Sequence, residues 1–296
     1  MTAPPVERIV YLGTPAVAVP PLYALAEAGF EIPLVITNKD KRRGRGADLA
    51  PTPVKRAAEK LGIPVSHRSA DAATVDADLG VVVAFGRIIR TNVLDAVPMV
   101  NIHFSLLPRW RGAAPVERAI LAGDEVTGVS LMALAPELDT GDVYATLQVP
   151  ITPNHTLESL RSELVMGACS MLVDHLKAGL GVPTPQEGEV TWAPKIAPEE
   201  LHLDLHQSAV QLSRVVRLGR AWTTFRGKRL VLHEAVVHQR ADGEPDLDIG
   251  ELRGAVLGTG SGALRLVRVQ MEGKPVMDVA DWQNGARVTP EDRLGQ

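Results

Sequence analysis

Residues 101–112 read N-I-H-F-S-L-L-P-R-W-R-G, and the apolar run V-V-V-A-F precedes them at residues 81–85. In an extended segment, side chains two apart point to the same face, so the Asn101 amide and the His103 imidazole are predicted to share one site. Polar residues that follow a buried strand are typical of an open α/β sheet, whose ligand crevice lies beyond the carboxyl ends of its strands. This stretch therefore predicts both the fold and the place of its site.

Apolar runs and helix-like runs alternate on both sides of this stretch. We predict strands at residues 8–12, 32–37, 79–85 and 128–134, and helices at residues 20–29, 51–61, 116–122 and 157–178. Such alternation is typical of a parallel sheet covered by helices. The first part of the chain is therefore predicted to be α/β, with an open, mostly parallel, Rossmann-like sheet and helices on both faces.

The sequence pattern changes after residue 179. Residues 181–200 are rich in Pro, Gly and Glu, a composition typical of a connector. A short helical pattern near residues 208–218 follows, and then short strand-like runs separated by glycine-rich turns, which predict a small β-barrel. We therefore expect a first domain at residues 1–181, a linker at 182–203 and an OB-like barrel domain at 204–296.

Composition narrows the classes of function. The 296 residues carry a formal net charge of −4, so a general affinity for polyanions is not expected. The single cysteine, Cys169, excludes a disulfide within the chain and fits a reducing compartment. No apolar run reaches the roughly 18–20 residues of a membrane span, and no signal or transit pattern opens the sequence. We expect a cytoplasmic monomer without a membrane partner.

A second polar string, L-D-T-G-D at residues 138–142, places carboxylates on a loop with a glycine. Asn, His and Asp side chains together can hold an oxyanion and move a proton. A zinc site is a weaker alternative, because one histidine and scattered carboxylates stand without an H-E-x-x-H motif or a cysteine pair. Phosphate binding by Gly13-Thr14-Pro15 is also weak, because the chain lacks G-x-G-x-x-G and P-loop spacings. We expect no metal.

The string N-I-H-F-S-L-L-P-R-W-R-G-A-A-P, together with L-D-T-G-D, resembles the 10-formyltetrahydrofolate-dependent formyltransferases. Further similarities lie in Y-L-G-T-P-A-V-A-V at residues 11–19, the basic insertion at 37–55, W-A-P-K-I at 192–196 and V-Q-M-E-G-K-P-V-M at 269–277. The resemblance is greatest to the members that act on methionyl-tRNA. It implies that the α-amino group of methionine on initiator methionyl-tRNA attacks the formyl carbon of 10-formyltetrahydrofolate, the cosubstrate.

The same resemblance implies a role for each residue of the site. Asn101 and His103 occupy the positions that stabilise the tetrahedral oxyanion, and Asp139 lies next to the histidine, where its charge favours imidazolium. The folate is expected to contact Ser105, Leu106, Leu107, Pro108, Phe85, Gly86, Leu138, Gly141 and Asp142. Plain core packing remains an alternative for the two leucines at 106 and 107.

Two basic segments are candidates for tRNA contact. The first is K-R-R-G-R-G at residues 41–46, and the second is the stretch 205–233, which contains no Asp or Glu. Arginine suits phosphates and stacked bases, while a solvated charged surface is the alternative for each segment. The residues expected to contact tRNA are Lys41, Arg42, Arg43, Arg45, Arg214, Arg217 and Lys228.

Three other functions remain open. A formyltransferase for amino-sugar nucleotides would need a nucleotide-sugar pocket instead of the basic segments. An RNA-binding protein with an inactive fold is disfavoured by the intact Asn101, His103 and Asp139. A formyltetrahydrofolate hydrolase would leave the basic segments unexplained. The chain departs from the family at L-G-R-A-W, residues 218–222, where a proline-rich turn is usual, and its barrel segment is short.

Overall fold

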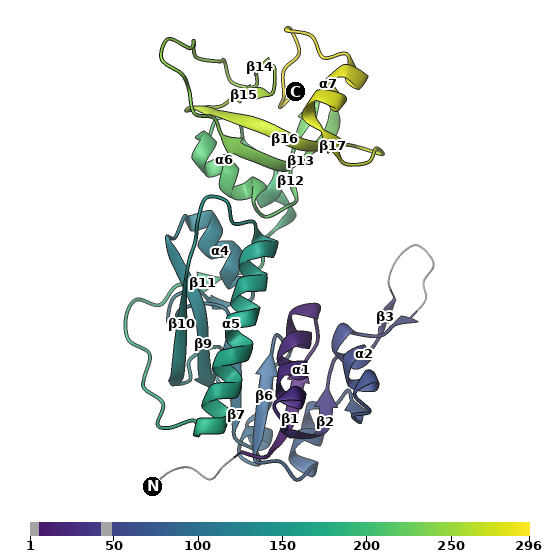
Figure 1. The fold of residues 1–296 in the computed structure, drawn as a ribbon, viewed down its shortest axis with the longest axis vertical. Coiled ribbons are helices and arrows are strands. Elements are labelled where there is room, and N and C mark those ends of the chain that lie inside the picture. The colour runs from purple at the N-terminus through teal and green to yellow at the C-terminus, as the bar shows by residue number, and fades with distance from the viewer. Residues whose placement is uncertain (1–5, 43–48) are drawn as a thin grey trace. The chain divides into compact units, whose positions relative to one another are not determined.

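The computed structural model describes residues 6–42 and 49–296 (Figure 1). Its contacts divide the chain into two compact units. The first contains the described residues up to Val116, with Val126–Pro150 and Arg161–Pro194, and the second contains Glu117–Glu125, Ile151–Leu160 and Lys195–Gln296. The domain boundaries expected from the sequence stay a prediction, and in the structure residues 182–194 of the expected linker lie in the first unit.

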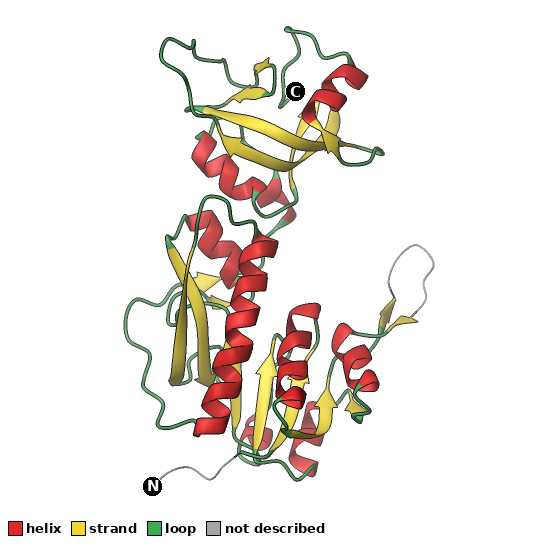
Figure 2. Ribbon diagram, viewed as in Figure 1, coloured by secondary structure: helices red, strands yellow, loops and turns green. Residues whose placement is uncertain are grey.

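A seven-stranded sheet forms the centre of the first unit (Figures 1 and 2). Its strands are β1 (Arg8–Gly13), β2 (Glu31–Ile36), β5 (Val65–Ser66), β6 (Leu79–Val83), β7 (Met99–His103), β9 (Val126–Ala133) and β10 (Val143–Pro150). The strand order is β10-β9-β7-β6-β1-β2-β5. Strand β9 pairs antiparallel with both β7 and β10, and all the other pairs are parallel. The predicted open, mostly parallel sheet is confirmed.

Helices accompany this sheet along the chain (Figure 2). They are α1 (Val19–Glu27), α2 (Pro53–Lys60), α3 (Thr91–Leu94), α4 (Pro115–Ala122) and α5 (Leu157–Ala178), with short 3-10 turns at η1 (Ala16–Ala18) and η2 (Ser69–Thr74). Thr52 caps α2, because its hydroxyl accepts a hydrogen bond from the Lys55 N–H at 3.0 Å. No helix among the described residues is both long and apolar enough to cross a membrane.

The central strands form because their residues can be buried on both faces. Every residue of β6, L-G-V-V-V, is buried, and so are Ile9, Val10, Tyr11 and Leu12 of β1. Continuous apolar runs of this kind are typical of parallel strands that are covered on both sides. Gly13 ends β1 where a Cβ would lie 2.8 Å from the Ala18 Cβ and 3.1 Å from the Val83 carbonyl oxygen, so the turn beside β6 has no room for a side chain.

The second unit contains an antiparallel sheet of six strands. Its elements are η3 (Pro198–Leu201), α6 (Ala209–Val216), β12 (Ala221–Phe225), β13 (Lys228–Val237), β14 (Leu252–Arg253), β15 (Val256–Gly258), β16 (Ala263–Met271), β17 (Met277–Asp278) and α7 (Val279–Ala286). The order is β12-β13-β16-β15-β14, and β17 pairs with β16. This separate sheet domain agrees with the predicted second domain.

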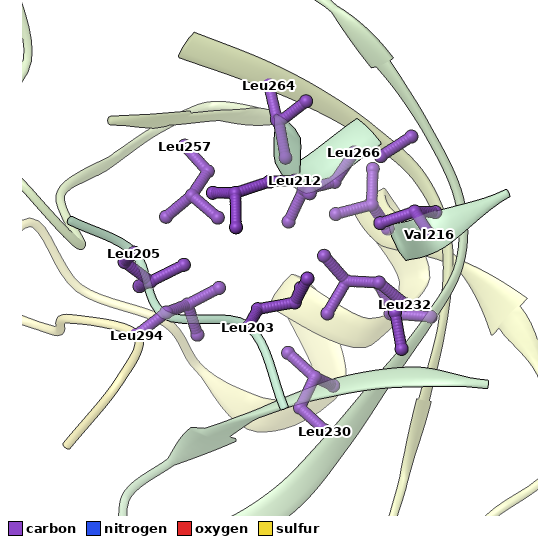
Figure 3. Packing of buried hydrophobic residues seen from close by; sticks show 14 of the residues in the cluster. Leu203, Leu205, Leu212, Val216, Leu230, Leu232, Leu257, Leu264, Leu266 and Leu294 are labelled. Atoms are coloured by element: carbon purple, nitrogen blue, oxygen red, sulfur yellow. The ribbon is translucent and has the colours of Figure 1, made fainter. Parts of the chain in front are cut away.

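Leucines fill the core of the second unit (Figure 3). Along β13, buried and more exposed residues alternate over Leu230, Val231 and Leu232, as expected for a strand with one face toward a core. Leu212 and Val216, one helical turn apart on α6, are buried in the same cluster. The cluster is mostly aliphatic, with Phe225 and Trp282 as its aromatic members, which agrees with the low aromatic content of 4%.

Some elements were not predicted from the sequence. Strand β10 has the burial pattern of an edge strand, with only Val149 buried, so its apolar signal is weak. A two-stranded pair joins β8 (Arg111–Gly112) to β11 (Trp192–Ala193), and a second joins β3 (Lys41–Arg42) to β4 (Leu49–Ala50). Two-residue strands carry no periodicity, so only contacts between distant segments reveal them.

Candidate active site

The site lies where the direction of the strand order changes. From β1 the chain proceeds to β2 on one side, and after β5 it returns to β6 on the other side of β1. Such a switch point is the usual place of a ligand crevice, beyond the carboxyl ends of the strands. Gly13, Val83 and His103 are the last residues of β1, β6 and β7 at this edge.

His103 and Asp139 form the central pair. The buried His103 imidazole has its Nδ1 3.7 Å from Oδ2 of Asp139. Its other nitrogen, Nε2, lies 2.9 Å from the carbonyl oxygen of Trp110. Because a carbonyl only accepts, Nε2 carries a proton in this arrangement, and Nδ1 faces the carboxylate. The same carboxylate oxygen accepts the Gly112 N–H at 2.8 Å, which holds it beside the ring.

Asn101 supplies an amide on the same strand. It lies two residues before His103 on β7, in register with Val82 on one side and Met132 on the other, so its side chain shares the face of His103. The residue is half-buried. Within the described part of the chain, no hydrogen bond engages its side-chain amide. The donors of this amide are therefore available to a bound group.

Asp139 itself and two residues of neighbouring loops have left-handed backbone. Ala84, Trp110 and Asp139 have φ angles of 46°, 63° and 53°, and they are three of the five non-glycine residues with positive φ among those described. Each such conformation costs roughly 1–3 kcal/mol, and strain of this kind clusters at functional sites. The Trp110 N–H donates to the Thr191 hydroxyl at 2.8 Å, so the turn is held from outside as well as by His103.

Comparison with known proteins decides the family. A family model described as formyl transferase matches residues 7–176, and a formyl transferase C-terminal domain model matches residues 195–287. The chain belongs to the formyl transferase family. Among curated proteins, a methionyl-tRNA formyltransferase of Streptomyces coelicolor is 41% identical over 309 residues, which cover 97% of this chain and 99% of that protein. Another, of Arthrobacter sp., is 39% identical over 94% of this chain and 96% of its own length.

Solved structures share the fold of this formyl transferase at low sequence identity. An N-formyltransferase from Helicobacter canadensis, in complex with folinic acid and dTDP-3-aminofucose, has a TM-score of 0.67 at 16% identity and covers 91% of this chain and all (100%) of its own. HypX from Aquifex aeolicus, in complex with tetrahydrofolic acid, has a TM-score of 0.63 at 21% identity and covers 93% of this chain and 46% of its own. These likenesses show the fold alone.

The loop after β7 is held by two serines. The hydroxyl of Ser105, which is 0% exposed, donates to the Arg109 carbonyl at 2.6 Å. Ser130 on β9 donates to the Ser105 carbonyl at 2.7 Å and accepts the Leu107 N–H at 3.1 Å. Ser105 was predicted to contact the folate, and in the structure its hydroxyl shapes the loop that would do so. Sequence reasoning missed Ser130, although a hydroxyl within an apolar strand is a usable signal.

The other predicted folate contacts differ in exposure. Leu106 and Leu107 are half-buried, Pro108 is buried, and Gly86 and Asp142 are exposed. Leu138 is 61% exposed, so its contact with the folate stays a prediction.

Phe85 behaves differently, because its ring packs in the core of the sheet and is 2% exposed. Its carbonyl accepts from the Thr14 hydroxyl at 3.2 Å and from the Asn38 amide at 3.1 Å. The ring of Phe85 is therefore not free to contact a ligand, and only its backbone atoms could do so. The Thr14 hydrogen bond connects the end of β1 to the end of β6.

Gly141 is required by a close approach of two backbones. A Cβ at Gly141 would lie 1.9 Å from the Ala133 carbonyl oxygen. We expect Gly141→Ala to lower the free energy of unfolding by about 1–3 kcal/mol, because the loop that carries Asp139 must move away from β9. Urea denaturation would measure this. Gly285→Ala is the control, since nothing lies within 4 Å of a Cβ there, and equal stability of both variants would contradict the expectation.

The first basic segment is described only in part. Lys41 is exposed at the start of the β3–β4 pair, and Arg42 is paired with Leu49 through its backbone. The predicted tRNA contacts Arg43 and Arg45 lie outside the described residues.

In the second unit, two of the predicted tRNA contacts have partners within the protein. Arg214 Nη1 donates to the Ala122 carbonyl at 3.2 Å, and Arg217 Nε donates to the His155 carbonyl at 2.7 Å. Burial lowers the pKa of the half-buried Arg217 guanidinium, and the nearby Arg214 lowers it further. Lys228, in contrast, is exposed at the start of β13.

Proposed function

We propose that this formyl transferase moves the formyl group of 10-formyltetrahydrofolate to the α-amino group of methionine on initiator methionyl-tRNA, for translation initiation. The observation that carries the chemistry is the His103–Asp139 pair, 3.7 Å apart, on the same side of the sheet edge as the Asn101 amide of β7, to which none of the described residues is hydrogen-bonded. The choice of acceptor is supported by the relatives, which match along nearly their whole length. The domain organisation that we propose is a formyltransferase domain at 1–181, a linker at 182–203 and an OB-like tRNA-binding domain at 204–296.

The chemistry follows from the charges that develop. When the amine attacks the formyl carbon, the carbonyl oxygen becomes an oxyanion, which the Asn101 amide and the His103 N–H stabilise. A charged acceptor forms a stronger hydrogen bond than the neutral Trp110 carbonyl, so the Nε2–H of His103 donates to the oxyanion instead of to that carbonyl. Asp139 stabilises the imidazolium form of His103. When the tetrahedral intermediate collapses, the bond between the formyl carbon and the folate nitrogen breaks, and that nitrogen gains a proton while the attacking amine loses one.

The structure offers a suitable surface for the folate cosubstrate. Leu138 and Ile88 are large apolar side chains with exposures of 61% and 85%, and an apolar ring system would cover them. The exposed residues Gly86 and Asp142 supply polar groups for the edge of a pterin. The remaining contacts that we propose are Ser105, Leu106, Leu107, Pro108, Phe85, Leu138, Gly141 and Asp142. No metal is part of this proposal, and the cell compartment that fits it is the cytoplasm.

The tRNA surface that we propose includes exposed cations of the second unit. The Arg229 guanidinium lies 4.5 Å from the centre of the Trp222 ring, a cation–π pair next to the exposed Lys228. Arg265 and Arg268 are exposed on β16. Arg214 remains a candidate because a guanidinium has five donors, and Arg217 is weaker because part of it is buried. The acceptor end of the tRNA would contact the first basic segment, at Lys41, Arg42, Arg43 and Arg45.

We expect Lys228→Ala to raise KM for methionyl-tRNA about threefold and to leave kcat unchanged, because phosphate contacts add affinity without specifying sequence. The slope of log affinity against log salt concentration should become less steep by about one, because one phosphate contact is lost. Steady-state kinetics at several salt concentrations would measure both. Lys177→Ala, which removes one positive charge at the end of α5, is the control, and equal effects of the two variants would count against this surface.

Formyl transfer from 10-formyltetrahydrofolate tests the proposed function directly. Methionyl-tRNA, uncharged tRNA and a dTDP-amino sugar would be offered separately to the wild-type protein, which we expect to act as a monomer. Transfer to methionyl-tRNA alone is the expected result. Transfer to the sugar, or release of formate to water, would overturn the choice of acceptor while leaving the family assignment in place.

A further inference from the structure

The side-chain amide of Gln186 is bonded at both ends. Its Nε2 donates to the carbonyl oxygens of Asp139 at 2.9 Å and of Gly141 at 2.8 Å. Its Oε1 accepts from Nε of Arg111 at 3.1 Å and from Nη2 at 2.6 Å. All these residues lie in the first unit. One amide therefore links the loop that carries Asp139 to strand β8.

This link acts on the geometry of the catalytic pair. The two carbonyls that accept from Gln186 belong to Asp139 and Gly141, on either side of Thr140. The amide therefore bridges the turn in which Asp139 has a φ of 53°. At the other end of the turn, the Asp139 carboxylate accepts the N–H of Gly112, the residue after Arg111. Backbone and side chain of Asp139 are thus both tied to β8, and the carboxylate has little freedom to leave His103.

The segment that carries Gln186 is itself anchored. Thr184 and Val143 exchange two backbone hydrogen bonds, of 2.8 and 2.9 Å. Trp192 and Ala193 pair with β8, and the Thr191 hydroxyl accepts from Trp110. Gln186 lies between these anchors, and so a rigid backbone carries its amide.

We propose that Gln186 is a positioning residue for formyl transfer, which acts by aiming the Asp139 carboxylate at His103. Its kinetic test rests on the proposed function, but its structural test does not. A merely structural role would lower stability and leave the Asp139–Gly112 contact and kcat of the folded protein unchanged. A positioning role changes both in protein that is still folded.

Two substitutions and one control separate these roles. Gln186→Leu removes all four hydrogen bonds, whereas the isosteric Gln186→Glu keeps an acceptor for Arg111 and sets a carboxylate against two carbonyl oxygens. Gln283→Leu is the control, because Gln283 also donates to a backbone carbonyl, that of Gly254 at 2.7 Å, but lies in the second unit. Each protein would first be checked for cooperative unfolding.

Two measurements decide the matter. We expect kcat for methionyl-tRNA to fall about 10- to 100-fold in both Gln186 variants, with KM nearly unchanged, because a small misplacement of a catalytic group is that costly. The Gly112 amide proton, followed by NMR in full-length protein, should move upfield as its bond to Asp139 weakens. Gln283→Leu should change neither value.

The outcomes are distinguishable. An unshifted Gly112 amide in folded Gln186→Leu would overturn the proposal, whatever the kinetics. Full kcat in Gln186→Glu would also overturn it, since the contact with Arg111 alone would then suffice. If the wild-type protein does not formylate methionyl-tRNA, the proposed function fails, and the Gly112 amide still decides whether Gln186 positions Asp139. If Gln186→Leu does not fold, Gln186→Glu provides the same amide measurement.

Discussion

Replacing His103 by alanine is expected to lower kcat for formyl transfer to methionyl-tRNA by about 10³-fold, within the range found for removal of a general acid–base group. The substitution removes the N–H that we assign to the oxyanion. It also removes the imidazole that lies 3.7 Å from Asp139, so the charge of Asp139 has no imidazolium to stabilise. Single-turnover transfer from 10-formyltetrahydrofolate would measure the chemical step apart from product release.

His67→Ala is the matched control for this variant. The His67 ring is half-buried, and its Nδ1 lies 3.0 Å from the Thr37 carbonyl, which follows β2 at the same edge of the sheet. It thus repeats the bond between a histidine ring and a backbone carbonyl without the Asp139 partner. Equal losses in the two variants would mean that His103 is structural, and full activity of His103→Ala would remove it from the mechanism.

The parts of the fold that the sequence predicts are those with local signals. Strands β1 and β6 are unbroken apolar runs, and the polar residues of the site directly follow buried strands. Asn101 and His103 share a face because extended backbone alternates, a rule that needs no tertiary information. Asp139 was placed by its glycine-containing loop and by the resemblance, and the structure brings it to His103.

The residues that support the site have no local signal. Gln186 and Thr191 lie in a segment whose Pro, Gly and Glu content is typical of a connector. Their partners are 45 to 81 positions away along the chain, so only the fold reveals them. The β8–β11 pair was missed for the same reason. A composition rich in turn residues does not distinguish a free linker from a loop that is fixed by side-chain hydrogen bonds.

Side-chain direction also limits what a sequence can tell. The resemblance implies that Phe85 lines the folate pocket, but in the structure its ring packs in the core, and its carbonyl accepts from the Thr14 hydroxyl. Arg214 and Arg217 were expected to contact tRNA, yet their long side chains donate hydrogen bonds to the Ala122 and His155 carbonyls. The residue type indicates which group is present, whereas the packing decides where that group points.

Asp139→Asn is expected to lower kcat about 100-fold, or about 2.7 kcal/mol of transition-state stabilisation, with little loss of stability. The amide has the shape of the carboxylate, and its oxygen can still accept the Gly112 N–H that Asp139 now accepts at 2.8 Å. What it lacks is the charge that stabilises imidazolium, and its NH₂ group facing Nδ1 favours the neutral ring. Single-turnover transfer would measure the loss. Glu137→Gln, an exposed carboxylate in the same loop, is the control.

The control decides where the charge effect lies. Equal defects in Asp139→Asn and Glu137→Gln would place the charge effect outside the His103–Asp139 pair. Full activity of Asp139→Asn would mean that formyl transfer does not need the charge of this carboxylate.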